Sequence, residues 1–126
     1  MGLLNKKQGL IALLLTLALT VSAQVNPSQI FANSYKFESS GDYQKAISEL
    51  NVLNGYDYHK ALRLGWLYYL AKDYENSKKF YNQAISLAPK STEALLGLCY
   101  PLEAQKKTDE LETVYKKILS LDKGNS

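Results

Sequence analysis

Two side chains of this sequence could carry out nucleophilic chemistry: Cys99, its one cysteine, and His59, its one histidine. A thiol becomes a strong nucleophile when a neighbouring base removes its proton, so the pair could form the dyad of a small hydrolase. The sequence contains no paired-carboxylate motif, no phosphate-binding loop and no metal-ligand spacing. Any catalysis therefore depends on whether the surrounding elements bring Cys99 and His59 together.

The elements that carry these residues are predicted to be helices. Throughout residues 24–126, apolar side chains recur every three or four positions, and no sustained stretch alternates as a β-strand would. Breaks in this pattern separate six segments of roughly 11–15 residues, and short helices joined by short turns pack as antiparallel pairs. The sequence therefore predicts an all-α fold of about three helix pairs. Asp42, Asp73 and Thr108 are the expected N-caps of the second helices.

These segments are related by an internal repeat. Leu64 and Leu98 lie 34 positions apart. The same interval relates three further pairs, Tyr81 and Tyr115, Ala84 and Ile118, and Leu87 and Leu121. A fixed period of this length is typical of a helical repeat protein, in which each unit buries its apolar face against the next.

The middle unit carries the fullest pattern. Its characteristic positions are Leu64, Gly65, Tyr68, Ser77, Tyr81, Ala84 and Pro89. With these residues, the unit 58–91 resembles the tetratricopeptide repeat. Residues 27–57 and 92–125 resemble the same pattern more weakly, and Leu111 and Pro101 depart from it in the last unit. The resemblance implies a right-handed superhelical array of these three units, in which Leu111 pushes the last helix pair apart or forces it to repack.

The N-terminus has the order of a secretion signal. Lys6 and Lys7 precede the uncharged apolar run of residues 10–21, and small residues follow up to Ala23. Residues 1–23 are therefore predicted to be a signal peptide, because the run is shorter than the roughly 20 residues of a membrane span. We expect an exported protein, periplasmic or at a bacterial envelope. An uncleaved anchor and a secreted eukaryotic protein remain the alternatives.

Removal of this segment leaves a nearly neutral chain. Residues 24–126 keep thirteen of the fifteen basic residues against twelve acidic ones, a net charge of +1. The sequence has no basic stripe for nucleic acid and no second cysteine for an intrachain disulfide. We expect no cofactor and no metal, and stability must come from packing alone.

The resemblance implies that the first helices line a concave face. That face comprises Ser28, Phe31, Tyr35 and Glu38, then His59, Leu62, Trp66 and Tyr69, then Glu93, Leu96, Tyr100 and Glu103. We predict that a protein or peptide partner binds there, mainly through Phe31, Tyr35, Glu38, Leu62, Trp66, Tyr69, Leu96, Tyr100 and Glu103. The acidic residues would favour a partner with Lys or Arg. Alternatively, the aromatic residues pack on one another, or they stack on sugar rings.

The same register argues against an enzyme. Cys99 falls at the position of Gly65, a packing site between helices, and His59 falls on an exposed face at a helix start. The alternative to a peptide-binding module is a structural subunit that assembles through its last helix. Its apolar residues Val114, Ile118 and Leu121 are expected to be uncovered there, as in a homo-oligomer or a longer array.

Overall fold

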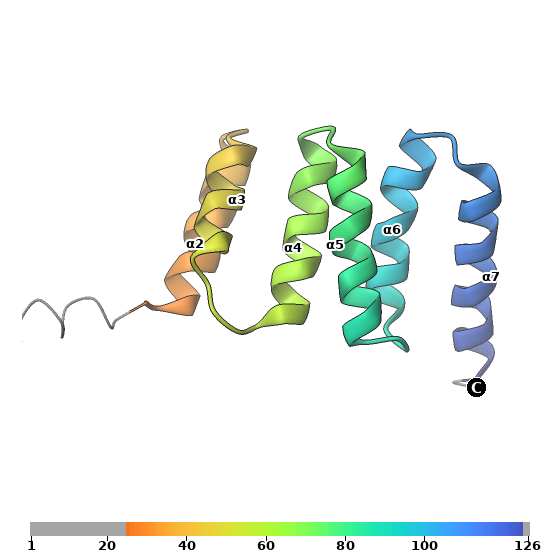
Figure 1. The fold of residues 1–126 in the computed structure, drawn as a ribbon. Coiled ribbons are helices and arrows are strands. Elements are labelled where there is room, and N and C mark those ends of the chain that lie inside the picture. The colour runs from red at the N-terminus through yellow and green to blue at the C-terminus, as the bar shows by residue number, and fades with distance from the viewer. Residues whose placement is uncertain (1–24, 125–126) are drawn as a thin grey trace, which may run out of the picture.

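A computed structural model describes residues 25–124, so the predicted signal peptide, residues 1–23, lies outside the described part of the chain. The described residues form six helices, which are α2 (Pro27–Ser39), α3 (Tyr43–Asn51), α4 (Asp57–Leu70), α5 (Tyr74–Leu87), α6 (Thr92–Ala104) and α7 (Thr108–Gly124). Consecutive helices lie side by side as antiparallel pairs (Figure 1). The predicted all-α fold of helix pairs is confirmed.

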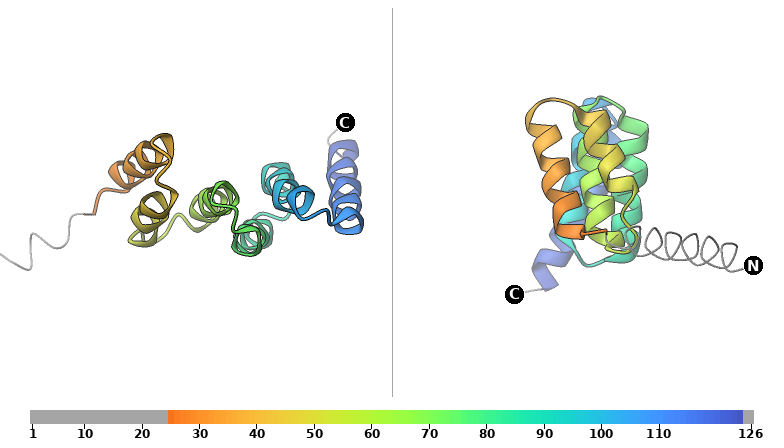
Figure 2. Two further views of the ribbon diagram at one scale, coloured as in Figure 1. Left: turned by 90° about the horizontal axis from the view of Figure 1, so that it is seen from above. Right: turned by 90° about the vertical axis from the view of Figure 1, so that its left-hand side faces the viewer.

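The helices follow one another in a zig-zag. Seen from above, α2, α4 and α6 lie along one side, α3 and α5 lie along the other, and α7 stands at the C-terminal end (Figure 2). Helix α5 packs on both α4 and α6, and α4 also contacts α6. None of the helices between residues 25 and 124 is long and apolar enough to cross a bilayer.

The turn within each pair has the same construction. Gly41, Lys72 and Lys106 have positive φ angles of 78°, 62° and 58°. Each donates its N–H to the carbonyl three residues earlier, which satisfies the end of the first helix. The conformation is free of strain at Gly41, whereas the two lysines adopt it at a steric cost.

Two of the three predicted caps form. The side chains of Asp42 and Asp73 each accept a hydrogen bond of 3.2 Å from the backbone N–H three residues later. The expectation for Thr108 is wrong by one residue. Helix α7 begins at Thr108 itself, and Lys107, whose side chain has no hydrogen-bond acceptor, stands where the aspartates stand.

The core runs between neighbouring pairs. One buried cluster joins α2 and α3 to α4 through Ile30, Ala46, Ile47, Leu50, Leu53, Leu64 and Leu67. A second joins α5, α6 and α7 through Tyr81, Leu95, Leu98, Cys99, Leu102 and Val114. Each pair therefore buries a face against the next one, as stacking of repeats requires.

Buried serines mark the closest helix contacts. In the first pair, the Ser34 hydroxyl donates to the Ala46 carbonyl at 3.1 Å. In the second pair, the Ser77 hydroxyl donates to the Gly65 carbonyl at 2.7 Å. Ser34 corresponds to Gly65 in the repeat, and Ala46 corresponds to Ser77. The serine therefore lies on the first helix in the first pair and on the second helix in the second pair. In both pairs its hydrogen bond joins the two helices.

The last helix does not present the face that we expected. Val114 is buried, and Ile118 and Leu121 are half-buried against the second cluster, because α7 turns them toward α5 and α6. The expectation that these three residues are uncovered is therefore wrong. The exposed apolar residues of α7 are instead Tyr115 and Leu119. Leu111 also packs at half-burial on this cluster, and α6 continues through the buried Pro101.

Candidate binding groove

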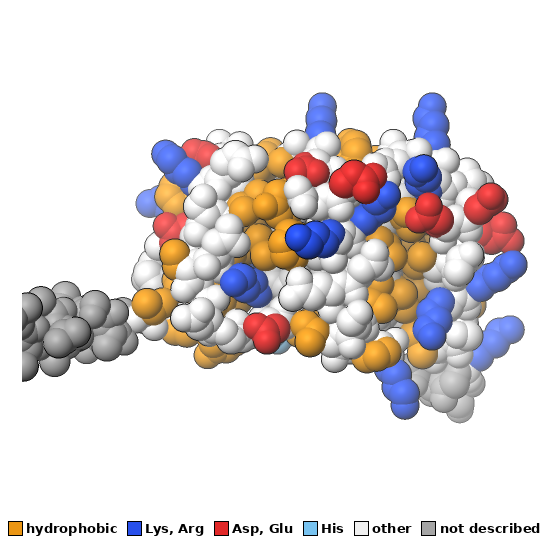
Figure 3. Space-filling model, viewed as in Figure 1, with side chains coloured by type: hydrophobic (Ala, Val, Ile, Leu, Met, Phe, Trp, Pro, Cys, Tyr) orange, Lys and Arg blue, Asp and Glu red, His pale blue; other side chains and the backbone are white. Residues whose placement is uncertain are grey.

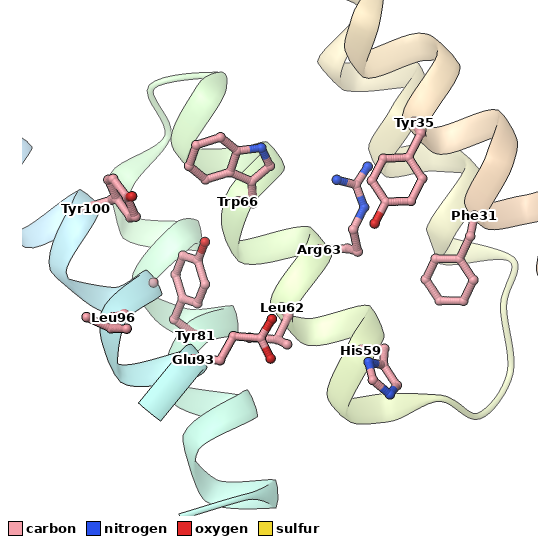
Figure 4. A pocket seen from close by; sticks show the side chains of 11 residues that line it. Phe31, Tyr35, His59, Leu62, Arg63, Trp66, Tyr81, Glu93, Leu96 and Tyr100 are labelled. Carbon is pink, nitrogen blue, oxygen red and sulfur yellow. The ribbon is translucent and has the colours of Figure 1, made fainter. Parts of the chain in front are cut away.

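A groove of about 610 Å³ lies among α2, α4, α5 and α6. It is lined by Phe31, Tyr35, His59, Leu62, Arg63, Trp66, Tyr81, Glu93, Leu96, Gly97 and Tyr100 (Figure 4). Most of these side chains are apolar or aromatic, and all the lining residues except Tyr81 belong to the three successive first helices α2, α4 and α6. The repeat spacing explains this, because it places corresponding residues of α2, α4 and α6 on the same side of the array.

One wall of the groove is an aromatic cluster. The ring centroids of Trp66, Tyr69 and Tyr100 lie 5.4–5.6 Å from one another, in tilted and edge-on arrangements. This contact holds α4 against α6. Tyr100 nevertheless stays 47% exposed, and the neighbouring Leu96 is 51% exposed. The aromatic residues of the predicted concave face therefore pack partly on one another, while Tyr100 and Leu96 remain open to a ligand.

The opposite wall is built around Arg63. Its guanidinium lies 3.9 Å from the ring centroid of Tyr35, which is the distance of a cation–π contact. It also makes a 3.1 Å ion pair with Glu38 and donates to the Ser34 hydroxyl at 3.1 Å. Because Arg63 belongs to α4 and its three partners belong to α2, this one side chain joins the first two helix pairs across the groove.

This pairing changes the expected acidic rim. Both carboxylate oxygens of Glu38 have partners, because one pairs with Arg63 and the other accepts from the Trp66 indole N–H. Its charge is therefore compensated inside the protein. Glu93 and Glu103 accept hydrogen bonds from tyrosine hydroxyls, and neither takes part in the ion pairs found among residues 25–124. Glu93 is the acidic residue that lines the groove.

The ring of Tyr81 forms the floor. Tyr81 belongs to α5, and only 4% of its surface is exposed. It fits because glycines face it on two helices: an added Cβ at Gly65 would lie 2.8 Å from the ring, and one at Gly97 would overlap it. Burial, together with the nearby Tyr100, raises the pKa of the Tyr81 hydroxyl above its ordinary value.

The structure brings six of the nine predicted contact residues to the groove lining. These six are Phe31, Tyr35, Leu62, Trp66, Leu96 and Tyr100. The other three lie elsewhere, with Glu38 and Tyr69 in contact with lining residues and Glu103 bonded to Tyr115. His59 and Glu93, two further positions of the concave face, also line the groove.

Sequence reasoning missed Arg63, Gly97 and Tyr81. Arg63 and Gly97 each follow a predicted position by one residue, which places them off the assumed face of the helix. Tyr81 lies on a second helix, whereas the residues predicted for the concave face all belong to first helices. The signal that could have revealed it is Gly97, a helical glycine beside an aromatic position of the preceding unit.

The potential dyad has no active-site environment. Cys99 is buried and its thiol donates to the Leu95 carbonyl of its own helix at 3.4 Å. Burial raises the pKa of the Cys99 thiol, which disfavours the reactive thiolate. His59 is exposed and lines the groove, whereas Cys99 is absent from its lining. Among residues 25–124, no cluster of His, Cys, Asp and Glu side chains is suited to hold a metal ion.

The surface charge is mixed. On the face shown in Figure 3, basic and acidic side chains alternate over the helices and leave apolar patches between them. This pattern differs from the continuous basic stripe with which proteins follow a nucleic-acid backbone.

Comparison with known proteins supports the repeat. Residues 61–91, which comprise most of α4, all of α5 and the turn after it, match the tetratricopeptide repeat family. No curated protein matches the chain. Tetratricopeptide repeats usually serve as non-catalytic scaffolds for protein–protein interaction, and the matched segment contributes four residues to the groove lining: Leu62, Arg63, Trp66 and Tyr81.

Proposed function

We propose that this chain is an exported protein-interaction module that binds a peptide segment or an amphipathic helix of a partner protein in the groove. The observation that carries this proposal is the exposure of large side chains around the groove. Tyr35 on α2, and Leu96 and Tyr100 on α6, are each about half exposed on two sides of one concave surface. Apolar side chains gathered in a concavity are typical of a binding site.

The groove favours a partner with an apolar anchor and a basic residue. Aromatic and aliphatic walls accept an apolar side chain and gain free energy from burying it. Arg63 is neutralised by Glu38, so Glu93 leaves the lining with a negative charge. A Lys or Arg of the partner next to Glu93 would compensate that charge. Sugar stacking is less well supported, because the rings of Trp66 and Tyr100 meet at 75° rather than forming a platform.

The test uses a random 12-residue peptide library displayed on phage and selected on the full chain. Binding of the selected peptides is then followed by fluorescence of Trp66, the single tryptophan. Leu96→Glu places a charge in the groove wall and should weaken binding at least about tenfold, which corresponds to 1.4 kcal/mol. Leu119→Glu is the matched control, because Leu119 is exposed to a similar extent but lies on α7 outside the groove.

Two results would contradict the proposal. One is a library that yields no peptide able to bind the folded chain. The other is a set of peptides whose affinity is unchanged by Leu96→Glu or is reduced equally by Leu119→Glu, since the binding surface would then lie elsewhere.

Export is proposed from the N-terminal sequence. Expression of the full chain in a bacterium, followed by fractionation and mass spectrometry, should recover a periplasmic product that begins at Gln24. A product that keeps Met1 and remains in the cytoplasm would remove this part of the proposal and leave the groove unaffected.

A second candidate function is assembly through α7. Tyr115 and Leu119 lie one turn apart, and they are 42% and 58% exposed. Light scattering over a range of concentrations should then show a dimer or larger species that Leu119→Glu converts to a monomer. A monomer at every concentration would exclude assembly through this surface.

A further inference from the structure

In the described part of the chain, the hydroxyl of Tyr81, at the groove floor, makes no hydrogen bond that stabilises the fold. The ring of Tyr81 is enclosed between Gly65 of α4 and Gly97 of α6, and neither position leaves room for even a Cβ beside the ring. The hydroxyl end of the same side chain lines the groove (Figure 4). A residue of a second helix thus reaches the surface formed by the first helices, through a slot made by two glycines.

The carboxylates at the groove are already bonded. Glu38 pairs with Arg63 and accepts from Trp66, and Glu93 accepts from Tyr58. Within residues 25–124, the structure gives the Tyr81 hydroxyl no hydrogen-bond partner. Arg63 Nε is also unpaired, but it is sealed from the surface. Tyr35 and Tyr100 also line the groove, but they are 52% and 47% exposed, so their hydroxyls can bond to water, whereas Tyr81 is only 4% exposed. The hydroxyl of Tyr81 is therefore the polar group of the groove floor that a ligand can reach and that the protein does not use.

The chemistry of this hydroxyl favours donation. A tyrosine hydroxyl is protonated at neutral pH, and burial and the neighbouring Tyr100, opposed in part by Arg63, raise the pKa of Tyr81 above its ordinary value. A ligand that fills the groove would cover the hydroxyl and cut it off from water. Leaving a covered donor without an acceptor costs free energy, so a ligand that supplies an acceptor is preferred.

We infer that the Tyr81 hydroxyl is a specificity-determining hydrogen-bond donor of the groove, and that it recognises a main-chain carbonyl oxygen of the bound peptide. This inference rests on the proposed function. A neutral carbonyl is favoured over a carboxylate because Glu93 places a negative charge in the same groove. Every residue of a peptide carries such a carbonyl, so the contact selects the path of the main chain rather than one side chain.

The experiment compares Tyr81→Phe with wild type, using the selected peptides and the fluorescence of Trp66. Phenylalanine keeps the ring between the two glycines and removes only the hydroxyl, so the melting temperature should stay within about 2 °C. Peptide affinity should fall about three- to tenfold, as expected for loss of one neutral hydrogen bond. Tyr115→Phe is the matched control, because Tyr115 is the equivalent residue of the next unit and its hydroxyl donates to Glu103 outside the groove lining.

A peptide series provides a second measurement. In it, each amide is replaced in turn by an ester, whose carbonyl oxygen is a weaker acceptor. One position should lose affinity for wild type and show a smaller loss with Tyr81→Phe, because the two changes remove the same hydrogen bond.

The outcomes separate this inference from the proposed function. If no peptide binds wild type, the proposed function fails. If peptides bind and Tyr81→Phe binds them as tightly as wild type does, the inference fails and the proposed function stands. The inference also fails if every ester position affects wild type and Tyr81→Phe equally, even where Tyr81→Phe weakens binding.

Discussion

Addition of a single methyl group at Gly97 tests the packing between the middle and last helix pairs. Gly97 lies within α6 and has no positive φ, so alanine there would ordinarily stabilise the helix by about 1 kcal/mol. The new Cβ, however, would overlap the ring of Tyr81. That ring cannot move away, because Gly65 already approaches it from the other helix.

The expected magnitude follows from these opposing effects. Overpacking of a core usually costs about 1–3 kcal/mol, and an aromatic ring held on both sides should lie at the upper end. After the gain in helix propensity is subtracted, Gly97→Ala should lower the free energy of unfolding by about 2 kcal/mol. For a domain of this size, the melting temperature should fall by about 8–16 °C.

Thermal and urea unfolding followed by circular dichroism measure this change. Asn82→Ala is the control for helix propensity, because Asn82 is exposed on α5, and it should raise stability by about 0.5 kcal/mol. Tyr81→Leu should cost less stability in the Gly97→Ala background than in wild type, since the smaller side chain leaves room for the methyl group. A Gly97→Ala variant as stable as wild type, or more stable, would refute the argument that the slot is closed to a side chain.

Three further predictions concern packing and reactivity. Glu38→Ala should lower the free energy of unfolding by about 1–3 kcal/mol, because Arg63, only 11% exposed, loses its carboxylate partner. As a control, Glu112→Ala removes an exposed ion pair and should change the free energy of unfolding by less than about 0.5 kcal/mol. Ser77→Ala should cost about 1 kcal/mol in urea unfolding, since its fully buried hydroxyl ties α5 to α4, and an unchanged midpoint would contradict this role. Burial and a raised pKa should make alkylation of Cys99 by iodoacetamide at pH 8 at least about tenfold slower in the folded chain than in urea. Mass spectrometry measures that rate, and equal rates would show that the thiol is accessible.

The path of the chain was largely readable from the sequence. The spacing of apolar residues, the turn residues and the capping aspartates influence only the backbone within a few residues. They therefore predict helices and turns without knowledge of the rest of the fold. The 34-residue period adds the stacking of pairs, because equivalent residues of equivalent units meet equivalent neighbours. The resemblance to the tetratricopeptide repeat implied that Tyr35, Trp66 and Tyr100 lie on one concave face, and all three line the groove.

Tertiary structure alone decided the chemistry of that groove. Periodicity gives the face of a helix on which a residue lies, but not how closely a neighbouring helix approaches or which side chain meets it there. Arg63 neutralises Glu38 because α2 and α4 meet at one particular distance. Tyr81 reaches the groove because α4 and α6 approach its ring at Gly65 and Gly97. Val114 is buried because α7 packs this side chain against the second cluster. These contacts join residues far apart in the chain. The repeat pattern permits many such contacts, and the packing geometry of the helices decides which of them form.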